Sequence, residues 1–246
     1  MSRAAFVLAS GSPRRRELVG LLGSPFETRA PRVDEAAAEH PALAKARAAR
    51  ARGATTLAGD TVIHLDGTRV GKPRDAGDAA AILRRLAGRE HEVVTDVAVI
   101  DAAGRELRFA VASRVRMRDF ARDEAERYAA SGEPLDAAGA YKIQGRGGVL
   151  VRSVDGCLAN VVGLPLCHVY EALRLAGRAF PERPERACQA HFEFSCPVWQ
   201  RAQAQGRALH DETRCNSWSP TSPSVDASPG RGAGPTTRAV RPYPAV

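Results

Sequence analysis

The sequence predicts an α/β fold in which a mixed β-sheet is flanked by helices. Short apolar segments typical of strands alternate with amphipathic, Ala-rich segments typical of helices as far as about residue 180. Within this alternation, residues 91–100 and 106–117 show period-two patterning and are joined by a short DAAG turn, which predicts an antiparallel hairpin. A chain of 246 residues, 44% of them hydrophobic, can bury a sizeable core.

The first predicted unit is a strand followed directly by a helix. Residues 5–9 (AFVLA) are expected to form a buried strand. Ser12 and Pro13 then open a helix to about Leu22, because a hydroxyl at the N-cap and a proline in the first turn are helix-start signals. Gly23 ends that helix.

The next predicted unit is a helix followed by a hairpin. Residues 36–51 are rich in Ala and are expected to be helical. Residues 55–65 form a strand, and a turn at Asp66-Gly67 leads to a short return strand ending at Val70.

The rest of the predicted domain repeats the alternation. Residues 75–87 form an amphipathic helix before the 91–117 hairpin, and residues 121–131 form another helix after it. Residues 148–154 are strand-like, and Pro165 begins a final helix to about Leu175.

Composition predicts a domain at 1–180 and an extension at 181–246. The last thirty residues are rich in Ser, Pro, Gly and Thr and lack apolar periodicity, so we expect the extension to be disordered. The alternative is a small module at 188–210 with a weak helix.

The charge balance favours an anionic partner. The net charge is +8, and the basic residues are 33 Arg and only three Lys, namely Lys45, Lys72 and Lys142. Where Arg is the usual cation, a retained Lys indicates a site that needs a compact point charge. The partner classes are a nucleotide, a nucleic acid or an acidic membrane surface.

Other features narrow these classes. Aromatic content is 5% and the basic residues are scattered, which disfavours a nucleic-acid partner. No run of 18 apolar residues appears, so we expect no membrane span. The N-terminus does not resemble a secretory signal, and none of the five cysteines forms a CxxC pair or a zinc pattern, so we expect a cytoplasmic protein.

The segment LASGSPRRREL (8–18) predicts an anion site. A strand ends in a small Ser-Gly-Ser turn and a helix begins after it, which exposes backbone N–H groups at the positive end of the helix. Arg14, Arg15 and Arg16 add guanidinium groups that can bind phosphate. The alternative is a capped helix with a solvated basic first turn.

Acidic side chains and lysines supply candidates for catalysis or metal binding. Glu35 follows an extended segment and could hold a divalent ion, although a helix N-terminus at Asp34 is the simpler interpretation. Asp60 interrupts an apolar run, where a carboxylate is costly unless it is paired or bound to metal; the alternative is a strand-edge bulge. Lys72, between Gly and Pro, can reach a phosphate.

The Gly-rich segment 131–151 predicts a ligand-binding loop. It carries the polar side chains Glu133, Asp136, Lys142 and Gln144, and Gln144 can hydrogen-bond a base edge. A flexible surface loop is the equal alternative. Residues 160–166 (NVVGLPL) are expected to serve packing.

Taken in order, LASGSPRRREL, VDE, GDTVI, GKPRD, SGEPLDAAGAYKIQG and NVVGLPL resemble the Maf family of nucleoside triphosphate pyrophosphatases over about residues 5–178. The resemblance implies a Maf/inosine-triphosphatase-like fold with two lobes and a central cleft. It also implies hydrolysis of a nucleoside triphosphate between the α and β phosphates with Mg²⁺ or Mn²⁺.

The resemblance also implies roles for individual residues. Asp60 would be the base that activates water, and Glu35 would be a metal or catalytic carboxylate, so that Glu35 and Asp60 hold the metal. Lys45 and Lys72 match catalytic lysines of the family. The substrate-binding positions are Ser12, Arg14, Arg15, Thr61 and Gln144. Substrate choice in the family follows the residues at three of these positions, which are Arg14, Thr61 and Gln144 here. This set resembles the set found in the dTTP/UTP branch.

Three alternatives accompany this interpretation. A 7-methyl-GTP pyrophosphatase typically shows SDQ and a KSEG loop, and neither is present. A regulatory nucleotide-binding protein linked to septum formation would follow if the short segment between Glu35 and Lys45 displaced either residue, and if Ala137, where the family has Lys, weakened the site. Lys142, five residues on, is a candidate replacement for that lysine. A basic nucleic-acid binder ranks lowest. The resemblance leaves open whether the protein forms a homodimer.

Overall fold

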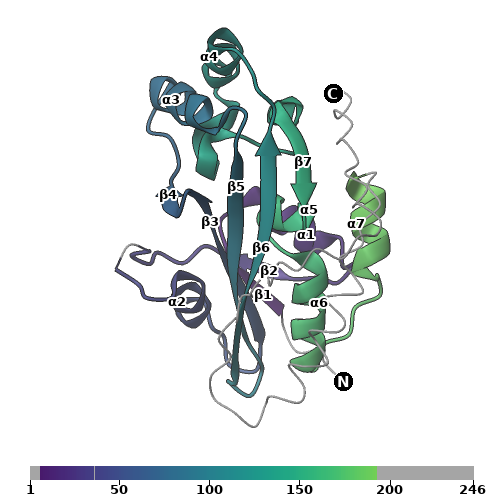
Figure 1. The fold of residues 1–246 in the computed structure, drawn as a ribbon. Coiled ribbons are helices and arrows are strands. Elements are labelled where there is room, and N and C mark those ends of the chain that lie inside the picture. Colours follow the sequence, from purple (N-terminus) through teal and green to yellow (C-terminus); the bar gives the residue numbers. More distant parts are fainter. Residues whose placement is uncertain (1–5, 36, 193–246) are drawn as a thin grey trace, which may run out of the picture.

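A seven-stranded mixed sheet forms the centre of the molecule. The computed structural model describes residues 6–35 and 37–192. The strands are β1 (Phe6–Ala9), β2 (Glu27–Arg29), β3 (Thr55–Leu65), β4 (Thr68–Val70), β5 (Glu90–Ile100), β6 (Glu106–Met117) and β7 (Val151–Asp155). Their order is β2-β1-β3-β5-β6-β7, with β4 paired to β3 (Figure 1). β1 runs parallel to β2 and β3, whereas the other pairs are antiparallel. The predicted mixed α/β fold is therefore confirmed.

Helices cover both faces of this sheet. They are α1 (Pro13–Gly20), α2 (Pro41–Ala48), α3 (Ala76–Leu86), α4 (Arg122–Ala130), α5 (Leu158–Val162), α6 (Leu166–Leu175) and α7 (Pro184–Phe192). Three 3₁₀ segments, η1 (Glu133–Asp136), η2 (Ala138–Ala140) and η3 (Arg146–Leu150), connect α4 to β7. Figure 1 shows α2 on one side of the sheet and α1, α5 and α6 on the other. None of the helices in the described ranges is long and apolar enough to cross a bilayer.

Two apolar cores follow from this arrangement. The smaller one lies between α2 and the sheet, where Leu43 and Ala46 pack against Ala58 and Ala98. The larger one fills the opposite face and includes Leu18, Leu57 and many other buried side chains. Because successive strand residues point to opposite faces, β1, β3 and β5 each contribute to both cores.

The helix expected at 36–51 is shorter than predicted. It begins at Pro41, and His40 before it has the non-helical angles φ −133° and ψ 84°. A proline disfavours helical angles in the residue that precedes it, so the Ala-rich stretch cannot continue as one helix through this point. Before this helix, the backbone N–H of Ala38 donates to the carbonyl oxygen of Asp34 at 3.1 Å.

The domain boundary expected near residue 180 also differs. Residues 184–192 form α7, whose Cys188 and Phe192 are buried in the larger core. His191 of α7 lies 3.2 Å from Glu17 of α1, so this helix packs onto the domain. The prediction of disorder was wrong for 184–192, because three apolar positions at helical spacing are enough to attach a short helix. Residues 193–246 of the predicted extension lie outside the described residues, as does most of the alternative module.

Candidate active site

The candidate site lies at a gap in the pairing of β3. The short strand β1 pairs with β3 at Thr55, Thr56 and Leu57, and β4 pairs with it again only from Ile63. Between these points one edge of β3 has no neighbouring strand, and a cavity of about 580 Å³ opens there. This gap explains how two consecutive residues on opposite faces of the strand, Asp60 and Thr61, line the same cavity.

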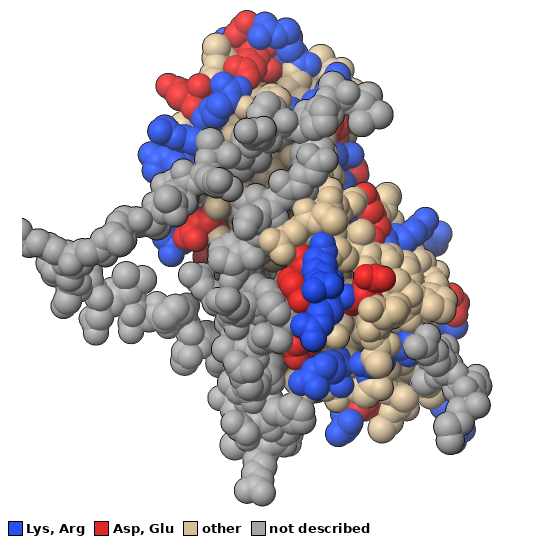
Figure 2. Space-filling model, turned by 90° about the vertical axis from the view of Figure 1, so that its right-hand side faces the viewer, with Lys and Arg blue, Asp and Glu red and all other residues tan. Residues whose placement is uncertain are grey.

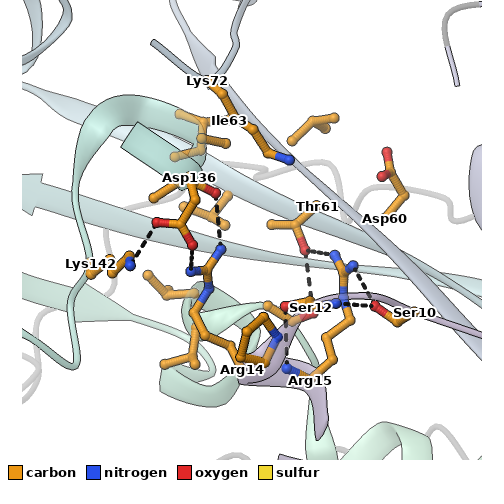
Figure 3. A pocket seen from close by; sticks show the side chains of 18 of the residues that line it. Ser10, Ser12, Arg14, Arg15, Asp60, Thr61, Ile63, Lys72, Asp136 and Lys142 are labelled. Atoms are coloured by element: carbon orange, nitrogen blue, oxygen red, sulfur yellow. Dashed lines mark hydrogen bonds and ion pairs between the residues drawn. The ribbon is translucent and has the colours of Figure 1, made fainter. Parts of the chain in front are cut away.

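All nine side chains predicted as site residues line this one cavity. They come from the β1–α1 turn, the first turn of α1, the segment before α2, α2 itself, β3, the segment after β4 and the loop before β7: Ser12, Arg14, Arg15, Glu35, Lys45, Asp60, Thr61, Lys72 and Gln144. The cavity also contains Lys142, so all three lysines of the chain lie around it. Figure 3 shows Arg14 and Arg15 on one side, with Lys72 reaching in from the opposite side.

The β1–α1 turn is organised by two serine hydroxyls. Ser12 is the N-cap of α1, and its Oγ accepts from the backbone N–H of Arg15 at 3.4 Å. Ser10, which is buried, accepts from the N–H of Ser12 at 3.2 Å and from the Arg15 guanidinium at 3.4 Å. The first turn of α1 contains no acidic residue, so its basic side chains and the positive helix end act together on the cavity.

Arg15 connects three separate segments of the chain. Its Nε donates to the carbonyl oxygen of Gly163 at 2.9 Å, and one terminal nitrogen donates to Thr61 Oγ1 at 2.9 Å. Partial burial lowers the pKa of Arg15, while nearby Asp60 favours its charged form. Gly163 has φ 135°, a conformation that favours glycine, and this turns its carbonyl oxygen toward Arg15. Arg15 is therefore held by the protein itself as well as facing the cavity.

Glu35, Lys45 and Asp60 form a linked group. The Lys45 ammonium donates to Asp60 Oδ1 at 2.9 Å and lies 2.8 Å from Glu35 Oε1. Lys45 and Asp60 are buried, whereas the Glu35 side chain is 49% exposed. The short connection between Glu35 and Lys45 thus brings the two residues into direct contact instead of separating them.

Arg14, Asp136 and Lys142 form a second group, on the other side of the cavity from Asp60 (Figure 3). Asp136 Oδ2 accepts from Arg14 at 2.8 Å, and Asp136 Oδ1 lies 2.6 Å from the Lys142 ammonium. Partial burial raises the pKa of Asp136, but the hydrogen bonds from Lys142 and Arg14 outweigh it and the pKa lies below its usual value. One carboxylate thus fixes two cations.

Lys72 and Gln144 are available for a ligand. Within residues 6–35 and 37–192, neither side chain makes a hydrogen bond or an ion pair. Lys72 is exposed and follows the end of β4, and Gln144 is partly buried. Polar groups that line a cavity without protein partners are the ones that can bind a ligand at least cost.

Sequence reasoning missed part of the site. Ser10 was covered only by the general Ser-Gly-Ser turn, and Gly163 was assigned to packing, although its carbonyl oxygen accepts from Arg15. Asp136 was named in the loop without a role, and Lys142 only as a candidate replacement for the family lysine at the position of Ala137. The signal for Lys142 was present, since it is one of only three lysines in the chain.

The loop that carries Gln144 is anchored to the sheet by a buried contact. His91 Nε2 of β5 and the hydroxyl of Tyr141 share a hydrogen bond of 2.8 Å. Both side chains are buried, and burial raises the pKa of the Tyr141 hydroxyl. Burial lowers the pKa of His91 to about 4, so the imidazole is neutral at physiological pH.

Acidification is expected to destabilise the fold through His91. An unfolded histidine has a pKa of about 6.5, so between this value and about 4 the unfolded chain binds a proton that the folded protein does not. The free energy of unfolding should therefore be highest above pH 6.5 and fall by about 2 kcal/mol from pH 7 to pH 5. Urea denaturation at the two pH values measures this.

The variant His91→Gln should lose most of that difference, because glutamine does not titrate. His64→Gln, on the neighbouring strand β3, is the matched control and should respond to pH as the wild type does. The same pH response in wild type and His91→Gln would assign the effect to other groups.

Comparison with known proteins identifies the family. The model of the Maf family, described as Maf-like protein, matches residues 5–176. The chain belongs to the Maf family. The predicted recognition is confirmed, and the matched region of the Maf-like protein contains every residue of the site but ends before α7.

The chain matches several similar proteins over nearly the whole length of each of them. The dTTP/UTP pyrophosphatase of Anaeromyxobacter sp. strain Fw109-5 is 45% identical over 188 residues, which are 71% of this chain and 91% of the relative. That of Burkholderia pseudomallei strain 1710b is 45% identical, covering 70% and 94%. That of Anaeromyxobacter dehalogenans strain 2CP-C is 46% identical, covering 72% and 97%. A solved nucleoside-triphosphatase, a dITP/XTP pyrophosphatase from Mycobacterium abscessus, aligns at 21% identity and a TM-score of 0.33 over 47% of this chain and 75% of that one.

Proposed function

We propose that this Maf-like protein hydrolyses dTTP and UTP to the monophosphate and pyrophosphate. The observation that carries the proposal is the cavity itself, in which the linked group Glu35–Lys45–Asp60 faces a set of cations. Six basic and three acidic side chains line it, which leaves an excess of positive charge suited to a polyphosphate. The names of the relatives, dTTP/UTP pyrophosphatases, support the same substrates.

The proposed reaction assigns Asp60 as general base. A water oxygen forms a bond to the α-phosphorus, the bond between that phosphorus and the α–β bridging oxygen breaks, and pyrophosphate leaves with the electron pair. Asp60 accepts the proton of the water, and Lys45 orients the carboxylate through its 2.9 Å hydrogen bond. Arg15, Lys72 and the N-terminus of α1 would stabilise the negative charge on the phosphate oxygens.

The carboxylates of Glu35 and Asp60 fit a divalent metal that binds together with substrate. Nowhere in the described part of the chain do three or more His, Cys, Asp or Glu side chains gather as a metal site. Two carboxylates are nevertheless a typical donor set for Mg²⁺, which takes its remaining ligands from water and substrate phosphates. A bound Mg²⁺ or Mn²⁺ would supply Lewis-acid stabilisation of the phosphate charge.

The pyrimidine preference is assigned to Gln144. The Gln144 amide has both donors and acceptors and no partner among the described side chains, so it can read a base edge. Thr61 has a different position: its hydroxyl lies 2.9 Å from both Arg15 and Thr95. We therefore assign Thr61 an indirect role, in which it sets the position of Arg15.

A nucleotide panel tests the proposed function. Purified protein with Mg²⁺ should release pyrophosphate from dTTP and UTP, and removal of the metal with EDTA should lower the rate by about a hundredfold or more. The measurement is pyrophosphate release over dTTP, UTP, CTP, ATP and 7-methyl-GTP. Equal or faster turnover of 7-methyl-GTP would reject the substrate assignment, and binding of every nucleotide without pyrophosphate release would favour a regulatory protein.

Two alternatives have less support. The regulatory hypothesis required Glu35 or Lys45 to leave the cleft, yet both line the cavity and touch each other. On the face in Figure 2, basic and acidic side chains are interspersed. Ion pairs such as Arg47–Glu106, at 2.7 Å, likewise balance positive charge with negative charge. This pattern does not favour a nucleic-acid binder. A cytoplasmic location belongs to the proposal because the nucleotide pool is there.

A further inference from the structure

All three lysines of this arginine-rich chain line the cavity, but they differ in how their charge is used. Lys45 lies between two carboxylates, so its positive charge is more than balanced. Lys72 has no ion-pair partner within the described residues. Lys142 shares its partner, Asp136, with Arg14, so this group of three carries one excess positive charge.

The three members of this group all line the cavity, but their side chains differ in exposure. The side chains of Lys142 and Arg14 are 22% and 20% exposed, whereas Asp136 is 54% exposed. The side chains of the two cations are therefore less exposed to water than the side chain of Asp136. A cation that is already partly dehydrated and held in place binds an anion with less loss of hydration and of side-chain freedom.

Contacts with neighbouring residues hold the backbone of Lys142 in place. The N–H of Lys142 donates to the hydroxyl of Tyr128 at 3.1 Å, and Ile143 next to it is buried. A Cβ atom at Gly147 would lie 2.9 Å from both the nitrogen and the oxygen of Lys142, so the loop packs closely around this residue. Lys142 is thus a point charge on a fixed backbone, with its ammonium held by Asp136, which suits a ligand with several equivalent oxygens.

We propose that Lys142 binds the polyphosphate of the substrate, with Asp136 holding Lys142 and Arg14 as a cation pair at one side of the cavity. This inference rests on the proposed function for the identity of the ligand. It assigns a substrate-binding residue beyond those expected from the sequence. Of the two ends of a nucleoside triphosphate, it commits Lys142 to the phosphate end and not to the base.

The test uses inorganic triphosphate, which has phosphate oxygens but no base. Isothermal calorimetry on the full chain should show that Lys142→Gln binds inorganic triphosphate about tenfold to a hundredfold more weakly than wild type, the expected effect of one charge-assisted hydrogen bond. Lys142→Arg keeps the charge and should bind within about threefold of wild type.

Arg146→Gln is the matched control. It removes the same charge from the same loop, but Arg146 is exposed and is not among the cavity residues. Its affinity for inorganic triphosphate should be unchanged, and thermal unfolding should give similar midpoints for all variants. Unchanged affinity in Lys142→Gln, equal weakening in Arg146→Gln, or a Lys142→Arg variant as weak as Lys142→Gln would each overturn the proposal.

Failure of this proposal and failure of the proposed function are distinguishable. Binding of inorganic triphosphate is measured without turnover, whereas pyrophosphate release from dTTP is measured separately. Lys142-dependent binding in a protein that releases no pyrophosphate would reject only the enzymatic function. If the wild type releases pyrophosphate normally but Lys142→Gln binds inorganic triphosphate as tightly as the wild type, only the role of Lys142 is rejected.

Discussion

Replacing Asp60 with asparagine is expected to lower kcat for dTTP by about a thousandfold, the usual contribution of a positioned general base. Asparagine retains an oxygen that can accept from Lys45, whose ammonium lies 2.9 Å from the carboxylate, but it cannot take a proton from water. The loss should therefore fall on turnover, with thermal stability close to that of the wild type. Pyrophosphate release under saturating dTTP, together with circular dichroism on heating, measures both.

Asp66→Asn is the matched control for this variant. Asp66 lies in the β3–β4 turn, outside the cavity, with φ 51°, a conformation that asparagine tolerates well. Its kcat should equal that of the wild type. An Asp60→Asn enzyme that keeps more than about a tenth of wild-type kcat would remove Asp60 from the role of base.

Replacing Arg15 with alanine is expected to affect both activity and stability. The variant loses the hydrogen bonds to Gly163, Thr61 and Ser10, which join α1 to β3 and to the turn after α5. We expect the free energy of unfolding to fall by about 3 kcal/mol, since hydrogen bonds from a charged group contribute about 1.5–3 kcal/mol each and water can replace part of them. kcat/KM for dTTP should fall by about a hundredfold or more as a phosphate-binding cation is removed.

Two further variants identify the cause. Arg15→Lys keeps the charge but lacks the planar fork that reaches three acceptors, so most of the loss should remain. Arg16→Ala removes a neighbouring, exposed arginine of the same helix that does not line the cavity, and it should leave both properties unchanged. Full activity in Arg15→Lys would show that charge alone matters and that the contacts to the three segments do not.

The elements that the sequence predicted best are those with a local physical cause. Ser12 and Pro13 begin α1 as expected, because capping and proline geometry act within one turn. The Asp66-Gly67 turn joins β3 to β4, and both residues have positive φ. The 91–117 hairpin follows from alternation along two neighbouring strands.

The parts that could not be predicted depend on contacts between distant segments. Arg15 meets Gly163 and Arg14 meets Asp136 across more than a hundred residues of chain, and periodicity carries no information about such pairs. The motifs of the resemblance nominated the nine site residues, but neither their spacing nor their chemistry indicated that β3 would lose its neighbour between Leu57 and Ile63. That gap in pairing is a property of the assembled sheet.

The confinement of every lysine to one cavity has a chemical consequence. Outside this cavity the chain carries its positive charge on guanidinium groups, which do not react with common acylating reagents at neutral pH. Apart from the α-amino group, the primary amines of the protein are Lys45, Lys72 and Lys142. A reagent selective for amines therefore labels the cavity and little else, so occupancy of the cavity can be followed by mass spectrometry without any engineered tag.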